Sequence, residues 1–303
     1  MKHDRSSDTA RFVLNGIYWV SQHPRLGSQV PGGLSRYTCE MTRCVEWSGR
    51  PAGSFLQRRM ALWKAGIMQA VSIPGIYLHQ MLRKRFIESI ARSEVLPSVS
   101  QLVVFGAGFD TLSLRVSASH PGLTVIEVDH PATQAAKIDA VDRFNMSAGR
   151  CIFVESDLEK DGVAGGLERC PDYDPEAPTL FVAEGLTMYL SESRVRELLN
   201  HVAASSPDSR LLFTYMEEAP DGRWDFREQR SLATKWLAFR NERFTWGATP
   251  GALRDLVAEC GLEVVAHRTP EDMRIEFLDA RNRDARLAHG ENTVLAAPRE
   301  TDS

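Results

Sequence analysis

Glycine and acidic residues follow several short apolar runs of this sequence, and their spacing suits a ligand that contains a nucleoside. The run VVFGAGFDT (103–111) places Gly106 and Gly108 directly after an expected strand. Glycine at that point permits a tight turn and lets a ligand approach the backbone closely. The dinucleotide-binding pattern has a third glycine where this chain has Thr111, so the motif alone leaves a structural turn and a nucleotide site equally open.

An aspartate ends the next apolar run, VIEVD, about twenty residues after the glycines. An acid at this spacing can accept hydrogen bonds from both hydroxyls of a ribose. The alternative is a helix N-cap, because Asp129 shortly precedes Pro131 and aspartate is a good capping residue. We favour the ribose role for Asp129.

Two further acids follow later apolar runs. Asp157 with Leu158 could hold an adenine ring, although an aspartate in this position could also cap the following helix. Glu184 ends the run TLFVAE, and a buried glutamate needs a cationic ligand group or an arginine as its partner. Acids at the ends of neighbouring strands favour an adenosine that carries positive charge, as in S-adenosyl-L-methionine (SAM). Arg83 and Arg85 are available for its carboxylate.

The order of apolar runs and helical stretches predicts how these residues are positioned. Buried strands are expected at 101–105, 123–128, 150–156, 179–184, 210–216, 262–268 and 293–297, with helices between most of them at 110–118, 131–144, 191–204 and 249–260. This alternation predicts an α/β fold with a mostly parallel seven-stranded sheet and helices on both faces. Helices are also expected at 9–22, 36–48, 54–72 and 76–93. We divide the chain into an N-terminal helical cap (1–97) and a SAM-binding core (98–303), with residues 216–247 as a lid insertion.

Composition narrows the class of protein. Lys and Arg number 36 against 40 Asp and Glu, a net charge of -4 that disfavours non-specific nucleic-acid binding. The five cysteines fit neither a zinc site nor a disulfide framework, so we expect reduced thiols and no metal. The sequence contains no apolar stretch of transmembrane length and no signal-peptide pattern at its start. We therefore expect a soluble, cytoplasmic protein that does not bind membranes; no pattern indicates its oligomeric state.

Five motifs together resemble the leucine carboxyl methyltransferase family, which includes polyketide O-methyltransferases of the tetracenomycin type. They are RKRFIE (83–88), VVFGAGFDTLSLR (103–115), VIEVDHPATQAAK (125–137), ESDL (155–158) and AEGLTMYL (183–190). The resemblance implies a class I, Rossmann-like methyltransferase fold that uses SAM and releases S-adenosylhomocysteine (SAH).

The resemblance also implies a role for each motif residue. Arg83 would bind the methionine carboxylate, Gly106, Ala107 and Gly108 the methionine backbone region, Asp129 the ribose, Asp157 and Leu158 the adenine, and Glu184 the methionine end near the sulfonium. One branch of the family has a lysine in its first helix where this chain has Ala10, and Arg11 is a substitute candidate.

The lead functional hypothesis is an O-methyltransferase that esterifies a carboxylate of a small, natural-product-like molecule. A carboxylate is ionised at neutral pH and needs no general base, and the sequence offers no obvious histidine base, since we expect His130 and His201 to be solvated. Methylation of a hydroxyl on a polyketide-like metabolite is the alternative, with Tyr189 and Tyr215 as substrate-side candidates and no base named. A dinucleotide-dependent oxidoreductase is less favoured because of Thr111.

Overall fold

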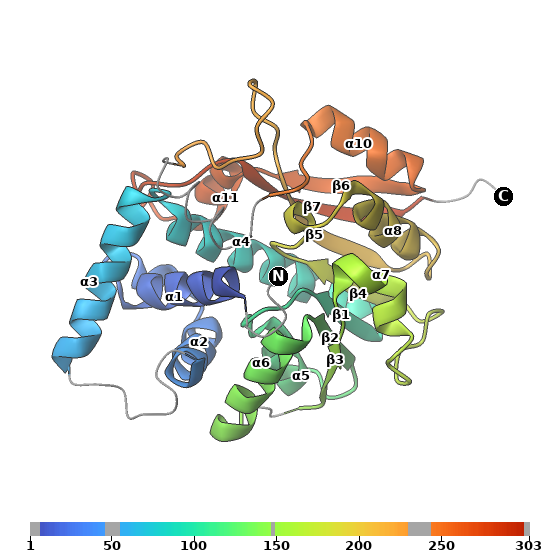
Figure 1. Cartoon of the computed structure of the whole chain (residues 1–303), viewed down its shortest axis with the longest axis horizontal. Helices are drawn as coiled ribbons and strands as arrows, with labels where there is room; N and C mark the ends of the chain where they lie inside the picture. The colour runs from blue at the N-terminus through green and yellow to red at the C-terminus, as the bar shows by residue number, and fades with distance from the viewer. Residues whose placement is uncertain (1–6, 46–54, 147–148, 230–243, 300–303) are drawn as a thin grey trace.

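A computed structural model describes residues 7–45, 55–146, 149–229 and 244–299 (Figure 1). The N-terminal part is helical, with α1 (Asp8–Gln22), η1 (Gly27–Gln29), α2 (Gly32–Val45), α3 (Phe55–Val71) and α4 (Ile76–Ile90), followed by the short turns η2 (Ala91–Val95) and η3 (Leu96–Ser98). Alternating elements follow: β1 (Gln101–Phe105), α5 (Leu112–Ser119), β2 (Thr124–Asp129), α6 (Pro131–Phe144), β3 (Cys151–Glu155), α7 (Leu158–Leu167), β4 (Thr179–Ala183), η4 (Thr187–Tyr189), α8 (Glu192–Ala203), β5 (Arg210–Met216), α10 (Pro250–Glu259), β6 (Leu262–Arg268), α11 (Pro270–Phe277) and β7 (Glu291–Pro298).

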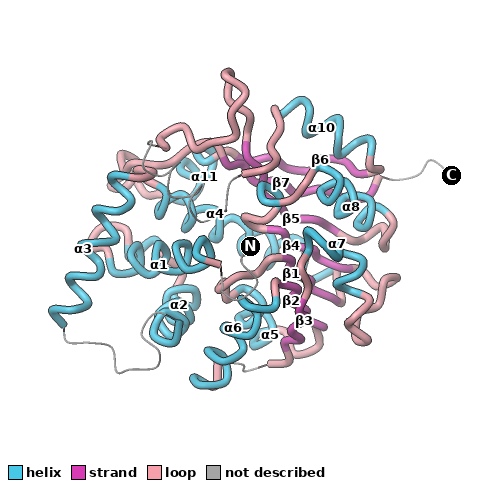
Figure 2. Tube along the Cα trace, viewed as in Figure 1, coloured by secondary structure: helices cyan, strands magenta, loops and turns pink. Residues whose placement is uncertain are grey.

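The described strands form one seven-stranded sheet in the order β3-β2-β1-β4-β5-β7-β6 (Figure 2). The pairs from β3 to β5 are parallel, whereas β7 runs antiparallel to both β5 and β6. The chain runs from β1 outward to β3 and then returns to β4 on the other side of β1. Ligands of open α/β sheets bind where the strand order reverses in this way.

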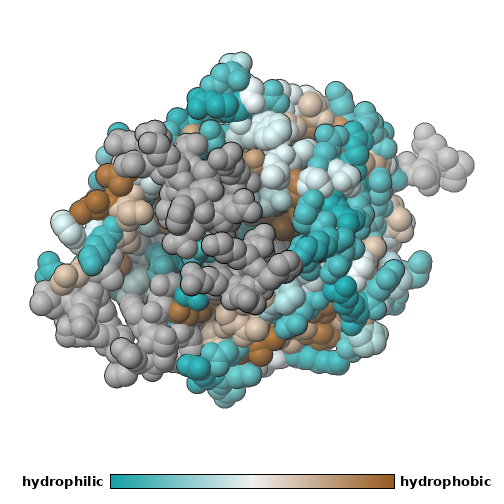
Figure 3. All heavy atoms as spheres, in the orientation of Figure 1, coloured by the Kyte–Doolittle hydropathy of each residue, from teal (hydrophilic) through white to brown (hydrophobic). Residues whose placement is uncertain are grey.

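Alternate residues of the central strands supply two cores, one on each face of the sheet. Leu102 and Val104 of β1 belong to one cluster with residues of α1, α4 and α11, while Val103 and Phe105 belong to another with residues of α7, α8 and α10. All five residues of β1 are buried, as expected for a strand covered on both faces. Polar residues dominate the outer surface over α7 and α8 on the right of Figure 3. The predicted mostly parallel sheet with helices on both faces is confirmed.

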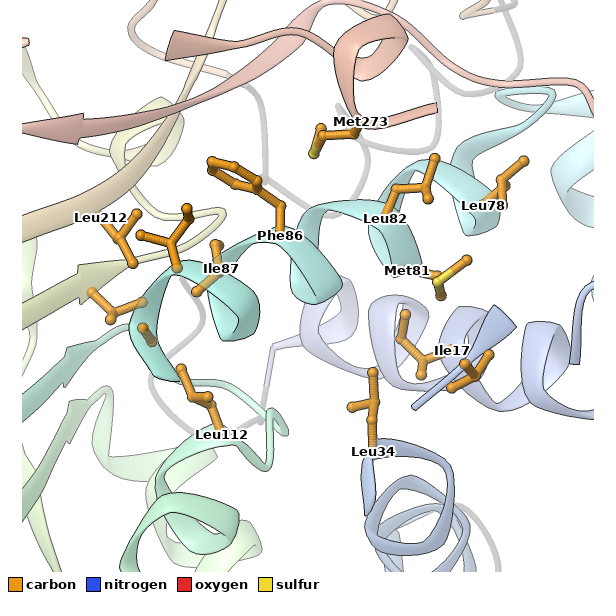
Figure 4. Close-up of a cluster of buried hydrophobic side chains, with 14 of the residues drawn as sticks. Ile17, Leu34, Leu78, Met81, Leu82, Phe86, Ile87, Leu112, Leu212 and Met273 are labelled. Atoms are coloured by element: carbon orange, nitrogen blue, oxygen red, sulfur yellow. The ribbon is translucent and has the colours of Figure 1, made fainter. Parts of the chain in front are cut away.

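Helix α4 joins the N-terminal helices to the sheet. Figure 4 shows Phe86 and Leu82 on its side toward Met273 of α11, and Met81 on its side toward Ile17 of α1. These side chains belong to one hydrophobic cluster with residues of β1, β4 and β5. The helices before residue 97 therefore share a core with the sheet, and the domain division at 97/98 stays a prediction.

We expect Phe86→Ala to destabilise the protein by about 3–5 kcal/mol, because it leaves a cavity in this cluster. Phe86 is 1% exposed and makes an edge contact with Phe277, at a centroid distance of 6.5 Å. Urea unfolding followed by circular dichroism measures the loss. Ile275→Ala on α11, where the side chain is 59% exposed, should change stability by about 0.5 kcal/mol or less. A similar small change in Phe86→Ala would contradict the assigned core.

The sequence analysis missed two helices, α7 and α11. Helix α7 contains three glycines, and Gly162 has a non-helical φ of 73°, so its apolar pattern is interrupted. Helix α11 has only eight residues, but it begins with a capping box in which Thr269 and Asp272 bond each other's backbone amides. The motif TPED was a readable start signal for this helix.

The predicted insertion, 216–247, is described at its two ends. Residues 217–229 and 244–247 form irregular backbone, apart from one bridge between Glu217 and Ala248. Trp246 is buried, and Trp224 packs against the core. Arg230, Lys235 and Trp236 lie outside the described residues.

Candidate active site

A cavity of about 610 Å³ lies at the carboxyl ends of β1 to β4. Gly106, Asp129, Asp157 and Glu184 line it, and each ends or closely follows one of these strands. Because the strand order is β3-β2-β1-β4, these four residues succeed one another across the sheet as Asp157, Asp129, Gly106 and Glu184. The structure therefore brings together the acids and the glycine turn that the sequence placed at strand ends.

The glycine turn after β1 needs glycine at two positions. Gly106 and Gly108 have φ values of 62° and 55°, in the left-handed region that disfavours other residues. A Cβ on Gly106 would lie 2.8 Å from the Leu186 side chain, and one on Gly108 would lie 3.1 Å from Ala10. Thr111, where a dinucleotide site has glycine, is instead the N-cap residue of α5.

Asp129 is held in place by backbone amides. The amide of His130 donates to Oδ1 at 2.6 Å, and that of Gly108 donates to Oδ2. His130, not Asp129, is the N-cap of α6, so the capping alternative for Asp129 is wrong. Burial raises the pKa of Asp129 to about 6, while the two amide bonds act in the opposite direction. Its remaining lone pairs can accept hydrogen bonds from a ligand.

Asp157 and Leu158 form the next part of the wall. Asp157 occupies the N-cap position of α7, but its side chain makes no capping hydrogen bond. Its carboxylate instead lies 3.0 Å from Lys160 Nζ and 4.0 Å from His130 Nε2. Burial alone would raise the pKa of Asp157, but Lys160 lowers it below the ordinary value. Leu158 is buried beside it and offers an apolar face to a flat ring.

A buried network of charges forms the other end of the wall. Arg83 donates to Glu184 Oε1 at 2.8 Å and to both oxygens of Glu291 at 2.6 Å. Lys84 donates to Glu184 at 2.9 Å and also pairs with Asp110. Arg83 is therefore engaged by two carboxylates of the protein, whereas the sequence analysis expected it to be available for a ligand.

Lys84, Asp110 and Glu291 also line the cavity, and the sequence analysis did not assign them a role. Lys84 and Asp110 stood inside quoted motifs, beside Arg83 and after Gly108, whereas Glu291 lay in no motif. Burial disfavours the charged form of all three residues. Lys84 nevertheless holds the pKa of Asp110 far below its ordinary value. Arg83 and His79 lower the pKa of Glu291 to about 2. The network thus sets three carboxylates against Arg83 and Lys84, with the His79 imidazole beside Glu291.

Three residues considered from the sequence do not reach the cavity. Arg11 is not among the lining residues: its guanidinium donates to the Val45 carbonyl at 2.9 Å and lies over the Phe109 ring. Tyr215 is fully buried on the other side of β5, with its hydroxyl 2.9 Å from His267 Nε2. Arg85 donates to the carbonyls of Gln29 and Phe277. The structure supports neither a cofactor contact for Arg11 nor a substrate contact for Tyr215.

Tyr189 and His130 do line the cavity. His130 is 8% exposed, so the expectation that it is solvated is wrong. His201 is also partly buried, with Nε2 3.1 Å from the Tyr173 hydroxyl and its ring against Phe181, on the opposite face of the sheet. His130 is the N-cap of α6, and His201 lies in α8. A sequence pattern does not reveal how these helices pack against the sheet.

The remainder of the cavity is mostly apolar. Its walls come from α1, the end of α3, the start of α4, the η4 turn and the described ends of the insertion. Aromatic rings dominate one side, where Phe244 packs against Tyr189 and Phe226 at centroid distances of 5.5 and 6.1 Å. The lining there also includes Phe12, Ile17, Met68, Ile73, Ile76 and Met188. This end suits an apolar second ligand.

The strand-end acids fit SAM by the chemistry of their side chains. The molecule carries positive charge on its sulfonium and amino groups, which complements the carboxylates of Asp129, Asp157 and Glu184 in the cavity wall. The glycine turn, residues 106–108, forms part of the cavity wall, and Asp129 keeps lone pairs for a sugar. The fold and the site together define a class I, SAM-dependent methyltransferase.

Comparisons with known proteins identify the family within this class. The model of the leucine carboxyl methyltransferase family matches residues 50–203, half of the chain, and the protein belongs to that family. Two bacterial relatives carry the name "Putative S-adenosyl-L-methionine-dependent methyltransferase". One, from Mycobacteroides abscessus, is 27% identical over 88% of this chain and 89% of its own. The other, YktD of Bacillus subtilis, is 26% identical over 66% of each chain. A DUF574 family protein from Streptomyces avermitilis has a similar structure, with a TM-score of 0.56 at 16% identity over 97% of this chain and 98% of its own.

Neither a membrane span nor a metal site is found in the described ranges. Their helices include none with the length and apolar character that a bilayer span requires. Their His, Cys, Asp and Glu side chains form no group of three or more that could hold a metal ion.

We expect Tyr215→Phe to leave methyl transfer unchanged and to lower stability by about 1 kcal/mol, because only the buried bonds to His267 and Asn292 are lost. Turnover and Tm measured on the same preparation separate the two effects. Tyr189→Phe is the matched variant inside the cavity. A loss of turnover in Tyr215→Phe at unchanged cofactor affinity would contradict the placement of Tyr215 outside the site.

Proposed function

We propose that the protein is an O-methyltransferase that transfers the methyl group of SAM to a carboxylate of a small, natural-product-like molecule. The observation that carries this proposal is the division of one cavity into a charged end at β1–β4 and an apolar end beneath α1, α3 and α4. A cavity of about 610 Å³ has the size of sites for drug-sized ligands.

The order of residues across the sheet supports assignments for the cofactor. Asp157 and Leu158 would hold the adenine, Asp129 the ribose hydroxyls, Gly106 to Gly108 the methionine backbone, and Glu184 the methionine end near the sulfonium. Arg83 would face the methionine carboxylate, and its pairing with Glu184 and Glu291 fixes where the guanidinium lies. Lys84, one residue on and also in the wall, is a second cation for that carboxylate.

The apolar end supports an acceptor that needs no general base. Tyr189 is the titratable side chain that the described lining places there. A carboxylate, with a pKa near 4, is already ionised at neutral pH, whereas a phenol or alcohol with a pKa of about 10 or more calls for a base. SAM supplies a methyl group on a good leaving group. The chain would contribute alignment of the acceptor and exclusion of water.

The first 97 residues would form the acceptor side of the enzyme. Helix α1 contributes Phe12 and Ile17 to the cavity wall, the end of α3 contributes Met68, and α4 contributes Ile76. These helices would select the acceptor, while the core that follows would hold the cofactor.

A panel of acceptors tests the proposal. Small aryl and alkyl carboxylic acids, each beside its phenol or alcohol analogue, are incubated with the full-length protein and SAM labelled in the methyl group. We expect label in a product that mild base hydrolyses, as a methyl ester does. A base-stable product formed from the hydroxyl analogues would favour hydroxyl methylation. No transfer to any acid would contradict the proposal.

A further inference from the structure

Gln80 is a buried polar residue in the wall of the acceptor end. It is 4% exposed and lines the cavity from α4. Among the described residues, its Oε1 has no hydrogen-bond partner. An unpaired buried acceptor costs stability. The NH2 group of the same amide is a donor, and only a donor can bind a carboxylate.

The position of Gln80 on α4 places it between the two ends of the cavity. Ile76, Gln80, Arg83 and Lys84 all line the cavity and lie on one face of the helix. At a rise of 1.5 Å per residue, Gln80 is about 4.5 Å along the axis from Arg83 and about 6 Å from Ile76. Its amide therefore stands where the charged end meets the apolar end.

The neighbouring helix leaves room for this amide. A Cβ on Gly16 of α1 would lie 2.5 Å from Gln80 Oε1 and 2.5 Å from the Tyr77 ring. Glycine in a helix interior costs about 1 kcal/mol relative to alanine. Here it allows α1 to pack against the amide with Oε1 turned toward Gly16, so the NH2 group is the half of the amide left to face the cavity.

We propose that Gln80 is a specificity-determining residue, which donates a hydrogen bond from its side-chain amide to the carboxylate of the acceptor. This inference rests on the proposed function and names the residue that selects its substrate class: an apolar body that carries a carboxylate. The amide group has two N–H donors, and a carboxylate oxygen is an acceptor of the matching kind.

A neutral donor suits this reaction better than a cation. The acceptor carboxylate loses its negative charge as its oxygen bonds to the methyl carbon and the carbon–sulfur bond breaks, because the products are a neutral ester and a neutral thioether. A cation would stabilise the charged ground state more than the transition state and would slow the step. An amide orients the oxygen with a weaker preference for the ground state.

Gln80→Met tests this inference, because methionine keeps the length of the side chain and removes its hydrogen bonds. The acid that the wild type methylates fastest in the panel above is the probe. We expect kcat/KM for this acid to fall about 10- to 100-fold, with the Kd for SAH within about twofold of the wild type. The Tm should rise by a few degrees, because an unpaired buried amide is removed.

Gln134→Met is the matched control. Gln134 is fully buried in α6, both of its amide atoms lack a partner among the described residues, and it does not line the cavity. The Gln134→Met protein should methylate the probe acid as the wild type does. Unchanged kcat/KM in Gln80→Met, or a parallel loss of SAH affinity measured by calorimetry, would overturn the inference. If the wild type binds SAH but methylates no acid, the proposed function fails and the inference falls with it.

Discussion

Replacement of Asp129 by asparagine should weaken SAH binding by about 100-fold or more. A carboxylate can accept charge-assisted hydrogen bonds from both ribose hydroxyls, each worth about 1.5–3 kcal/mol. The amides of Gly108 and His130 already donate to Asp129. In asparagine, the NH2 group would face one of these donors, so the side chain loses acceptor capacity toward both protein and ligand. Titration calorimetry with SAH measures the loss.

The same residue predicts a pH dependence of cofactor binding. In the ligand-free protein, burial raises the pKa of Asp129 to about 6, above its ordinary 3.8. Ligand hydroxyls favour the ionised form, so SAH affinity should be constant above pH 7 and fall by up to about tenfold per pH unit below pH 6. The raised pKa also means that the ligand-free protein loses stability through Asp129 as pH rises from about 3.8, and that this loss is complete above about pH 6.

Asp139→Asn is the control for both measurements, because Asp139 lies on α6 with its side chain 59% exposed. It should bind SAH as the wild type does, with the same pH dependence. Asp129→Asn should lose the decline below pH 6. If Asp129→Asn binds SAH with wild-type affinity at pH 7.5, Asp129 does not bind the ribose.

The sequence predicted the sheet and the row of acids because both depend on local patterns. Strands buried on both faces read as continuous apolar runs, and parallel strands bring their carboxyl ends to one edge of the sheet. Asp129, Asp157 and Glu184 each follow such a run directly. Their position at one edge of the sheet could therefore be predicted without knowing how the helices pack.

Other features of the site depend on contacts that a local pattern does not contain. Arg83 and Glu291 are 208 residues apart in the chain and meet because β7 inserts antiparallel beside β5. Tyr215 belongs to the face of β5 opposite to Met216, since successive side chains of a strand alternate. Arg11 of α1 donates to the Val45 carbonyl at the end of α2, a contact that only the docking of the two helices reveals.

Glu291→Ala should cause a loss of stability as large as that of Phe86→Ala. Glu291 is 1% exposed, and both of its oxygens bind Arg83, while His79 Nε2 lies 2.8 Å from Oε2. Removing one partner of a buried ion pair leaves an uncompensated charge and costs about 3–5 kcal/mol. We therefore expect Tm to fall by roughly 5–8 °C, given an unfolding entropy of about 2.1 cal/mol/K per residue. Glu263→Ala, at an exposed position of β6, should leave Tm nearly unchanged.

The effect of Glu291 should depend on pH with a definite sign. Its folded-state pKa is lowered from 4.5 to about 2, so its contribution is complete above about pH 4.5 and is lost as pH falls toward 2. The penalty of Glu291→Gln, which keeps the shape of the side chain, should therefore shrink between pH 5 and pH 3. Because Glu291 also fixes Arg83, this variant should weaken SAH binding at pH 7.5, where the wild type is folded. If Glu291→Gln binds SAH with wild-type affinity, Glu291 does not position Arg83. If its loss of stability does not change with pH, Glu291 does not act through its charge.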